Sequence, residues 1–204
     1  MANKSKKING LIEKVLQTET ESFADKYAQV EGLVEPLNSE EREILVERIR
    51  EMYETESRAA LGFTLYGNLK ELSDQVLKQL YEDNSNRAIV IHIIRKFDIK
   101  EAYENLEDLL QISNEDELEP NLVLTMFLLY QERAKEKLGN YFENAGTEDL
   151  TFILSNILYD SFVKKDKNKA DKFIDLIKKR KDYQAILNIS YSNVFEGIGS
   201  YGLT

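Results

Sequence analysis

Few side chains in this sequence have a type and spacing suited to chemistry, and the first of them is His92. It is the only histidine among 204 residues, and there is no cysteine. A free imidazole has a pKa of about 6.5 and could act as a general base. His92 lies, however, inside the apolar run Ile89–Ile94, so we expect a packed histidine at the edge of the core. No nucleophile motif, phosphate loop, dinucleotide fingerprint, calcium loop or Glu-x-x-His pattern accompanies it, so we expect no catalytic residue, no cofactor and no metal.

The second set is a group of carboxylates that a helix would bring together. Residues 101–119 include eight acidic residues and neither lysine nor arginine. Acidic residues spaced by three and four positions share one face of a helix, and like charges at that spacing repel weakly. One interpretation is a docking face for a basic protein, formed by Glu101, Glu104, Glu107 and Asp108. The other is a solvated helix face that leads into a loop.

The third set has the opposite charge. Residues 164–181 contain nine lysines or arginines against three aspartates. Such a segment could bind nucleic acid or an acidic protein. It could equally supply cations to helix C-termini and keep the chain soluble. The residues of this candidate basic patch are Lys169, Lys172, Lys178, Lys179, Arg180 and Lys181.

Charge over the whole chain favours a protein partner over nucleic acid. The formal net charge is −10, whereas nucleic-acid binders neutralise phosphates with lysine and arginine. An acidic chain suits a basic protein partner, although acidity also simply maintains solubility. Residues 19–58 carry twelve acidic residues against five basic ones. Because acidic and basic segments are separated along the chain, head-to-tail self-association is a further option.

Helices are the elements that must position these side chains. Two prolines and nine glycines leave few residues that break helices. A chain of this length is a single domain by default. The longest apolar run, Leu122–Tyr130, is nine residues long and too short to span a bilayer. With no secretory signal in view and no cysteine, the sequence predicts a soluble cytoplasmic protein that does not engage a membrane.

The sequence pattern divides the chain into three parts and marks several helix starts. Asn38 and Glu41 have the spacing of a capping box, in which each side chain accepts a hydrogen bond from the other residue's backbone. Ser57 and Thr147 are predicted to cap later helices. The three parts are an N-terminal helical segment at 1–37, helix pairs at 38–181, and a C-terminal helix with a glycine-rich tail at 182–204.

The middle part repeats itself. Residues 58–82 align with residues 87–112 at an offset of 29, which becomes 30 after a one-residue slip. A third copy at 120–144 follows at an offset of 32, and we expect its two helices to meet at residues 133 and 134. A fourth pair is predicted between residues 147 and 177. Helix pairs that cannot bury their apolar faces alone stack on their neighbours.

Paired helices at this spacing resemble HEAT-like repeats. The resemblance rests on Arg58-Ala59 and Arg87-Ala88, which look like the opening of short HEAT-like units, and on Asp98 near the turn between helices. It covers about residues 39–180, and the third and fourth copies lack the opening. It implies an all-α fold of stacked antiparallel helix pairs, a short α-solenoid, with an irregular helical bundle as the alternative. HEAT-like proteins are mostly binding scaffolds, so the resemblance implies a binding surface and no reaction.

Taken together, these patterns predict a non-catalytic protein-interaction module. Its specific form would be an inhibitor or immunity-type protein that binds a basic partner through acidic helix faces. The alternative is a nucleic-acid-associated regulator that uses residues 164–181. A helical enzyme with His92 as its base is the third hypothesis, and no motif supports it.

Overall fold

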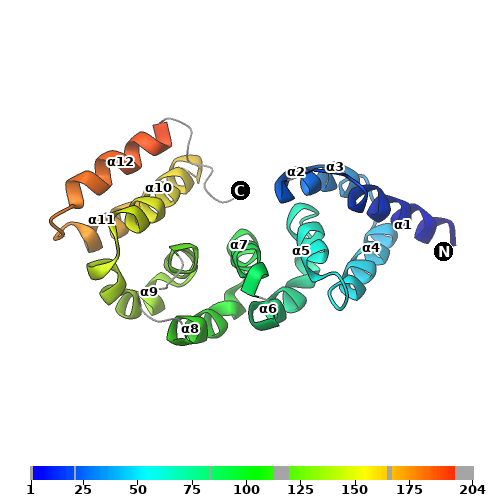
Figure 1. Ribbon diagram of the computed structural model, residues 1–204, viewed down its shortest axis with the longest axis horizontal. Coiled ribbons are helices and arrows are strands. Elements are labelled where there is room, and N and C mark those ends of the chain that lie inside the picture. Colours follow the sequence, from blue (N-terminus) through cyan, green and yellow to red (C-terminus); the bar gives the residue numbers. More distant parts are fainter. Residues whose placement is uncertain (1, 21, 83, 113–119, 165–166, 196–204) are drawn as a thin grey trace. The chain divides into compact units, whose positions relative to one another are not determined.

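The computed structural model describes residues 2–20, 22–82, 84–112, 120–164 and 167–195, and within these ranges the chain forms helices and no strand (Figure 1). The all-α prediction is therefore confirmed. The β-branched run Ile89–Ile94, which a strand could also have accommodated, lies within helix α7 (Arg87–Phe97). No helix in the described ranges has both the length and the apolar composition needed to cross a bilayer.

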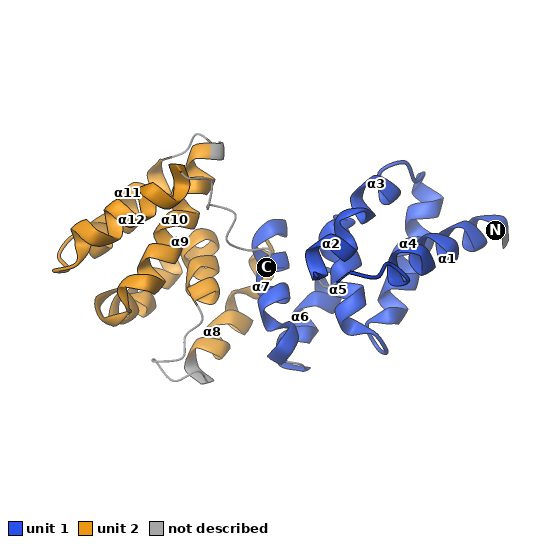
Figure 2. Ribbon diagram, turned by 45° about the horizontal axis from the view of Figure 1, so that its top comes forward, with its two compact units in different colours: residues 1–97, 204 blue, residues 98–203 orange. Residues whose placement is uncertain are grey.

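The chain divides into two compact units, residues 1–97 and residues 98–203 (Figure 2). Compactness alone does not decide whether two units fold independently, so the single domain stays a prediction. Unit 1 contains α1 (Ala2–Leu16), α2 (Phe23–Ala28), α3 (Val30–Val34), α4 (Ser39–Met52), α5 (Ser57–Tyr66), η1 (Lys70–Leu72), α6 (Ser73–Glu82), η2 (Asn84–Asn86) and α7. Unit 2 contains η3 (Lys100–Ala102), α8 (Tyr103–Ile112), α9 (Pro120–Asn144), α10 (Thr147–Lys164), α11 (Asn168–Ile177) and α12 (Tyr183–Phe195).

Helix α5 lies at the centre of unit 1. Its residues 60–65 are all buried, because α2, α3, α4 and α7 each pack against it. Gly62 is needed at the contact with α2, since a Cβ there would come within 2.6 Å of the Tyr27 ring. The Tyr27 ring also meets Phe63 edge-on at 5.6 Å between centroids. This burial raises the pKa of Tyr27 to about 12.

Three aromatic rings form a cluster within the core of unit 2. Phe127 and Phe142 come from the two halves of α9, and Phe173 comes from α11. The rings meet edge to face, with centroids 6.0 Å, 5.3 Å and 5.2 Å apart. This is the arrangement that aromatic quadrupoles favour. Truncating a buried phenylalanine costs about 3 to 5 kcal/mol, so this cluster holds α9 and α11 together.

The helix starts were predicted with mixed success. The capping box before α4 is confirmed, because Asn38 Oδ1 accepts from the Glu41 N–H at 3.0 Å and Glu41 Oε2 accepts from the Asn38 N–H at 3.1 Å. The Ser57 prediction is wrong, since Ser57 is the first residue of α5 and its hydroxyl oxygen accepts from Asn86 Nδ2. The Thr147 prediction is wrong as well, since Thr147 is the first residue of α10 and not the residue before it. Its hydroxyl donates to a distant carboxylate, described below.

The first two copies of the repeat share one kind of connector. Asn68 and Asp98 both adopt the left-handed conformation, with φ of 51° and 56°. Each is followed by a buried apolar residue, Leu69 or Ile99, then by a short 3-10 turn and the next helix. A left-handed residue is a common way to end a helix, and asparagine and aspartate tolerate it better than most residues. The local structure thus repeats with the sequence, while membership of the HEAT-like class stays a prediction.

The third copy differs at its connector. Helix α9 has a kink at Tyr130, whose φ of −129° and ψ of 30° are not helical. At the offset of 32, Tyr130 is equivalent to Asp98, so the break lies three residues before the predicted one at residue 133. The Tyr130 hydroxyl donates to the Ile99 carbonyl at 2.6 Å and ties the kink to the preceding connector.

Candidate protein-binding site

The four carboxylates predicted to dock a basic partner lie on η3 and α8. Glu101, Glu104 and Asp108 are exposed, whereas only 20% of the Glu107 side chain is. The other acidic residues of the predicted group, at positions 115–119, lie outside the described residues. The structure therefore brings three of the four predicted carboxylates to the surface together and holds the fourth against a neighbouring helix.

Packing against α9 fixes which side of α8 faces outward. Tyr103, Leu106 and Leu109 are buried on one side of α8. The Arg133 guanidinium lies over the Tyr103 ring, 3.7 Å from its centroid, as in a cation–π contact. The Tyr103 hydroxyl is 3.3 Å from Glu107 Oε1. These contacts make α8 a firmly held support for its outward carboxylates.

Lys137 of α9 forms an ion pair with Glu107. Residues 101–119 contain no base, so reading that segment alone could not show this partner, which lies 30 residues further along the chain. Glu101, Glu104 and Asp108 have no hydrogen bond or ion pair within the described residues. The face thus consists of three unpaired carboxylates beside one that is already neutralised.

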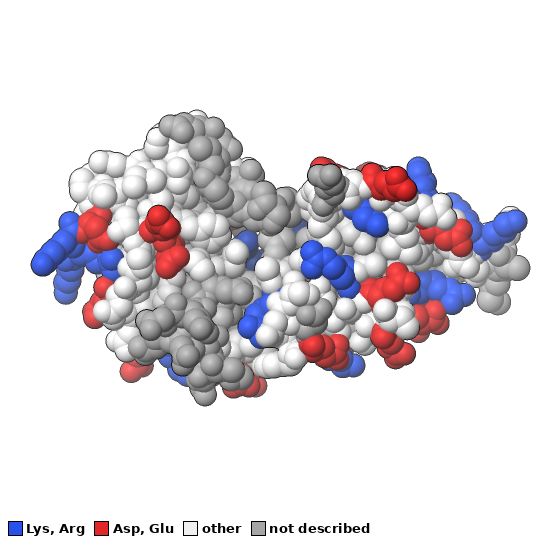
Figure 3. All heavy atoms as spheres, viewed as in Figure 1, with Lys and Arg blue, Asp and Glu red and all other residues white. Residues whose placement is uncertain are grey.

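The basic segment is only partly available. Lys172 Nζ is 2.9 Å from Gln131 Oε1 and 3.5 Å from a Glu132 oxygen, and Lys178 pairs with Asp175 at 2.8 Å. In the described part of the chain, the remaining lysines of the candidate patch have no ion pair; these are Lys169, Lys179 and Lys181. On the face of unit 2 seen in Figure 3, basic side chains gather where α11 meets α12. Residues 165 and 166 lie outside the described residues.

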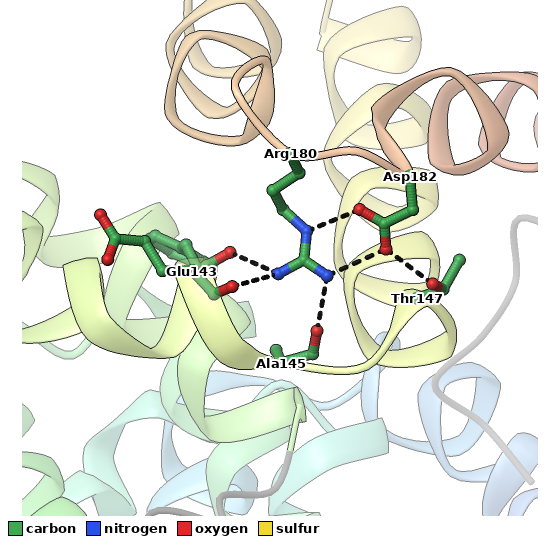
Figure 4. A network of polar contacts seen from close by, with 6 residues as sticks. Glu143, Ala145, Thr147, Arg180 and Asp182 are labelled. Carbon is green, nitrogen blue, oxygen red and sulfur yellow. Dashed lines mark hydrogen bonds and ion pairs between the residues drawn. The ribbon is translucent and has the colours of Figure 1, made fainter.

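Arg180, which the sequence placed in the basic patch, is instead part of the internal structure of unit 2 (Figure 4). Its NH1 donates to the carbonyls of Phe142 and Glu143 at 3.1 and 2.6 Å, and its NH2 donates to the Ala145 carbonyl at 2.9 Å. These carbonyls lie at the C-terminal end of α9, where no intrahelical donor remains for them. The side chain is 16% exposed, so it is not free to bind an external phosphate.

Asp182 fixes the orientation of Arg180. Its carboxylate accepts two hydrogen bonds from the guanidinium, both at 2.9 Å, and a third from the Thr147 hydroxyl at 2.7 Å. The hydrogen bonds from Arg180, followed by the one from Thr147, hold the pKa of Asp182 well below its usual range. Sequence reasoning missed this network because Arg180 and Asp182 lie 35 to 38 residues from their partners at residues 142–147. It joins the end of α9 and the start of α10 to the residues just before α12.

His92 is half-buried, as a packed residue at the edge of the core should be. Its Nδ1 is 3.1 Å from Arg95 NH2. Burial, followed by the nearby charges of Arg95 and Lys96, lowers the pKa of His92 to about 4. The imidazole is therefore neutral at pH 7. Among the residues that the structure describes, no three histidine or acidic side chains converge as a metal site.

Comparison of the chain with protein-family models, curated proteins and solved structures finds no match.

Proposed function

We propose that this chain is a non-catalytic protein-binding module of the inhibitor or immunity type, which docks a basic partner on the outward face of η3 and α8. The acidic face is defined by Glu101, Glu104 and Asp108. The observation that supports the proposal is that these carboxylates are exposed and unpaired on a helix whose other side is packed firmly against α9.

The acidic face differs from acidic residues elsewhere on the surface because its carboxylates are held in place by the packing of α8. Carboxylates on a helix that is held in place lose little conformational freedom when a partner binds, so more of the interaction energy remains as affinity. Two exposed cations of unit 2, Lys100 and Lys137, already pair with Asp98 and Glu107. The three free carboxylates are therefore available for lysines and arginines of another protein.

The test compares the chain with a charge-reversed form, Glu104→Lys plus Asp108→Lys, as bait in a native lysate. We expect the wild-type chain to retain a basic protein at low and at moderate salt, and the reversed form to lose it. Both positions are exposed, so circular dichroism should show unchanged helicity.

A matched control separates the acidic face from general acidity. Glu43→Lys plus Glu54→Lys makes the same change in net charge at two exposed positions of unit 1 that have no ion pair among the described residues. This control should retain the partner. Equal retention by all three baits would contradict the proposed site, and equal loss in both variants would reduce it to a net-charge effect.

Fewer basic side chains are available for the nucleic-acid alternative than the sequence suggested. The Arg180 guanidinium already donates to backbone carbonyls of the same unit. Within the described residues, the cations of the patch without an ion pair are Lys169, Lys179 and Lys181. Retention of nucleic acid only at low salt, lost on Lys179→Glu plus Lys181→Glu, would favour this alternative over the protein-binding function.

A further inference from the structure

The C-terminal helix of unit 2 differs in composition from the rest of the chain. Residues 183–195 contain no charged residue, although 31% of the chain is charged. Large apolar side chains are nevertheless exposed on α12: Ile189 is 46% exposed, Tyr191 43% and Phe195 83%. The Tyr191 and Phe195 rings stack one helical turn apart, 6.5 Å between centroids.

Helix α10 continues this apolar surface. The Ser190 hydroxyl lies 3.3 Å from the Thr151 carbonyl, and Asn193 Nδ2 donates to Ser155 Oγ at 3.3 Å, so α10 and α12 run in the same direction. Figure 1 shows the two helices side by side. Helix α12 ends at Phe195 while α10 continues.

Two aromatic side chains of α10 are exposed beyond the part that α12 covers. Tyr159 and Phe162 lie four and seven residues after Ser155, on the same side of the helix, and are 45% and 77% exposed. Five of the six large apolar side chains that are exposed in the described chain therefore lie on α10 and α12. The sixth, Tyr81, is on α6. We call Tyr159, Phe162, Tyr191 and Phe195 the apolar end of unit 2. Ile189 lies on the opposite flank of α12, since it is two residues from Tyr191 on the helix.

We infer that the apolar end of unit 2 is a self-association surface, on which a second copy of this chain binds through the same side chains. A two-fold axis brings a surface against itself, so an uncharged face is self-complementary without any matching of charges. Acidic surfaces on a chain of net charge −10 would repel their own copies, whereas α12 has no charge to repel.

The size of the surface fits a reversible dimer. At about 200 Å² for each large side chain, the exposed fractions of these four leave about 500 Å² per copy, or about 1,000 Å² for two copies. This lies at the weak end of specific interfaces, so association should depend on concentration. Self-association of this kind uses side chains of α10 and α12, not the acidic residues of η3 and α8.

The experiment is sedimentation velocity of the full chain over a wide concentration range. We expect the mass to rise from 23.7 kDa toward twice that value. Phe162→Ser plus Phe195→Ser should stay monomeric at every concentration, and Tyr191→Lys should weaken the dimer without removing either phenylalanine. The matched control, Tyr81→Ser, removes an exposed aromatic ring elsewhere and should associate as the wild type does.

Salt and a shortened chain separate the competing explanations. An apolar dimer should be unchanged or tighter in about 0.5 M NaCl, whereas association between acidic and basic segments would weaken as charges are screened. Removing residues 196–204 should leave the dimer intact. The inference would be overturned by a wild-type chain that is monomeric throughout, or by a dimer that survives the double serine variant. It would also be overturned by a dimer that salt dissociates or that is lost when residues 196–204 are removed.

Discussion

At the scale of single residues, His92 shows how burial changes what a side chain can do. An imidazole with a pKa of about 4 is uncharged at neutral pH and takes up a proton only in acid. In the unfolded chain its pKa returns to about 6.5. The unfolded state therefore binds the proton first, and this contribution to stability is complete above about pH 6.5 and is lost as the pH falls toward 4.

We expect the imidazole of His92 to show no titration between pH 8 and pH 5.5. Because it is the only histidine, its proton NMR signal needs no assignment. The midpoint should lie near pH 4 in the folded chain and near 6.5 in urea. A folded-state midpoint near 6.5 would show that the ring is solvated and would restore it as a candidate base.

Arg180 has a structural role that its neighbours in sequence do not share. Replacing it with alanine removes the donor to three carbonyls at and just after the end of α9, and it takes from the Asp182 carboxylate its two guanidinium hydrogen bonds. We expect the free energy of unfolding to fall by about 2 to 3 kcal/mol, since hydrogen bonds to a charged donor are the stronger kind. Lysine should recover only part of the loss, because an ammonium cannot form the fork that Asp182 accepts.

Urea denaturation with a matched control tests the role of Arg180. Lys179→Ala removes the adjacent, exposed cation and should change the free energy of unfolding by less than about 0.5 kcal/mol. Equal effects at positions 179 and 180 would contradict the capping role. Asp182→Asn adds a pH test: its deficit relative to the wild type should shrink as the pH falls below the ordinary aspartate pKa. The unfolded chain then takes up a proton at Asp182, whereas the folded chain, whose Asp182 pKa is lowered, still holds the carboxylate charged.

At the scale of elements, the connectors at Asn68 and Asp98 explain why the repeat tolerates a slip of one residue. A single left-handed residue ends the first helix, and the 3-10 turn after it restarts the chain before the second helix. The residue at the connector must therefore adopt a positive φ, whereas the helices on either side need only ordinary helical dihedral angles. A β-branched residue at either position would be strained, since its Cβ meets the backbone when φ is positive.

Glycine scanning should reveal this requirement. Asn68→Gly should be neutral or slightly stabilising, whereas Asn68→Val should cost about 1 to 2 kcal/mol. Lys78→Gly, at an exposed helical position of the same unit, should cost about 1 kcal/mol. Thermal or urea denaturation measures all three variants. A loss at Asn68→Gly as large as that at Lys78→Gly would contradict the left-handed connector.

Sequence reasoning succeeded where partners lie close together in the chain and failed where they do not. The Asn38–Glu41 capping box was predictable because its two residues are three positions apart. Ser57 and Thr147 were assigned to helix caps, but Asn86 and Asp182, 29 and 35 residues away, bind their side chains instead.

The candidate site shows the same limit. The spacing of Glu104, Glu107 and Asp108 predicted that they share one face of a helix. Glu104 and Asp108 are exposed on α8, and Glu101 is exposed on η3. Neutralisation of Glu107 by Lys137 depends on how α9 packs against α8, and no local pattern contains that information. The same holds for Arg180, whose carbonyl partners lie 35 to 38 residues earlier in the chain.

At the scale of the whole molecule, the net charge of −10 should control how fast a basic partner arrives rather than how long it stays. We expect the association rate constant with a basic partner to fall about tenfold or more between about 0.05 and 0.5 M salt, with little change in the dissociation rate constant. Surface plasmon resonance or stopped-flow mixing measures both. A dissociation rate constant that rises steeply with salt while association stays constant would contradict long-range steering.

The repeated connector also has a consequence for how the length of the chain can change in evolution. The left-handed connectors at Asn68 and Asp98, 30 residues apart, are the pattern expected if one coding segment was duplicated in tandem, whereas the break at Tyr130 has different dihedral angles. Each duplication adds a helix pair together with the turn that allows the next pair to follow, so length can change by a whole copy without redesigning the junction. The chain can therefore diverge by gaining or losing copies as well as by point substitution.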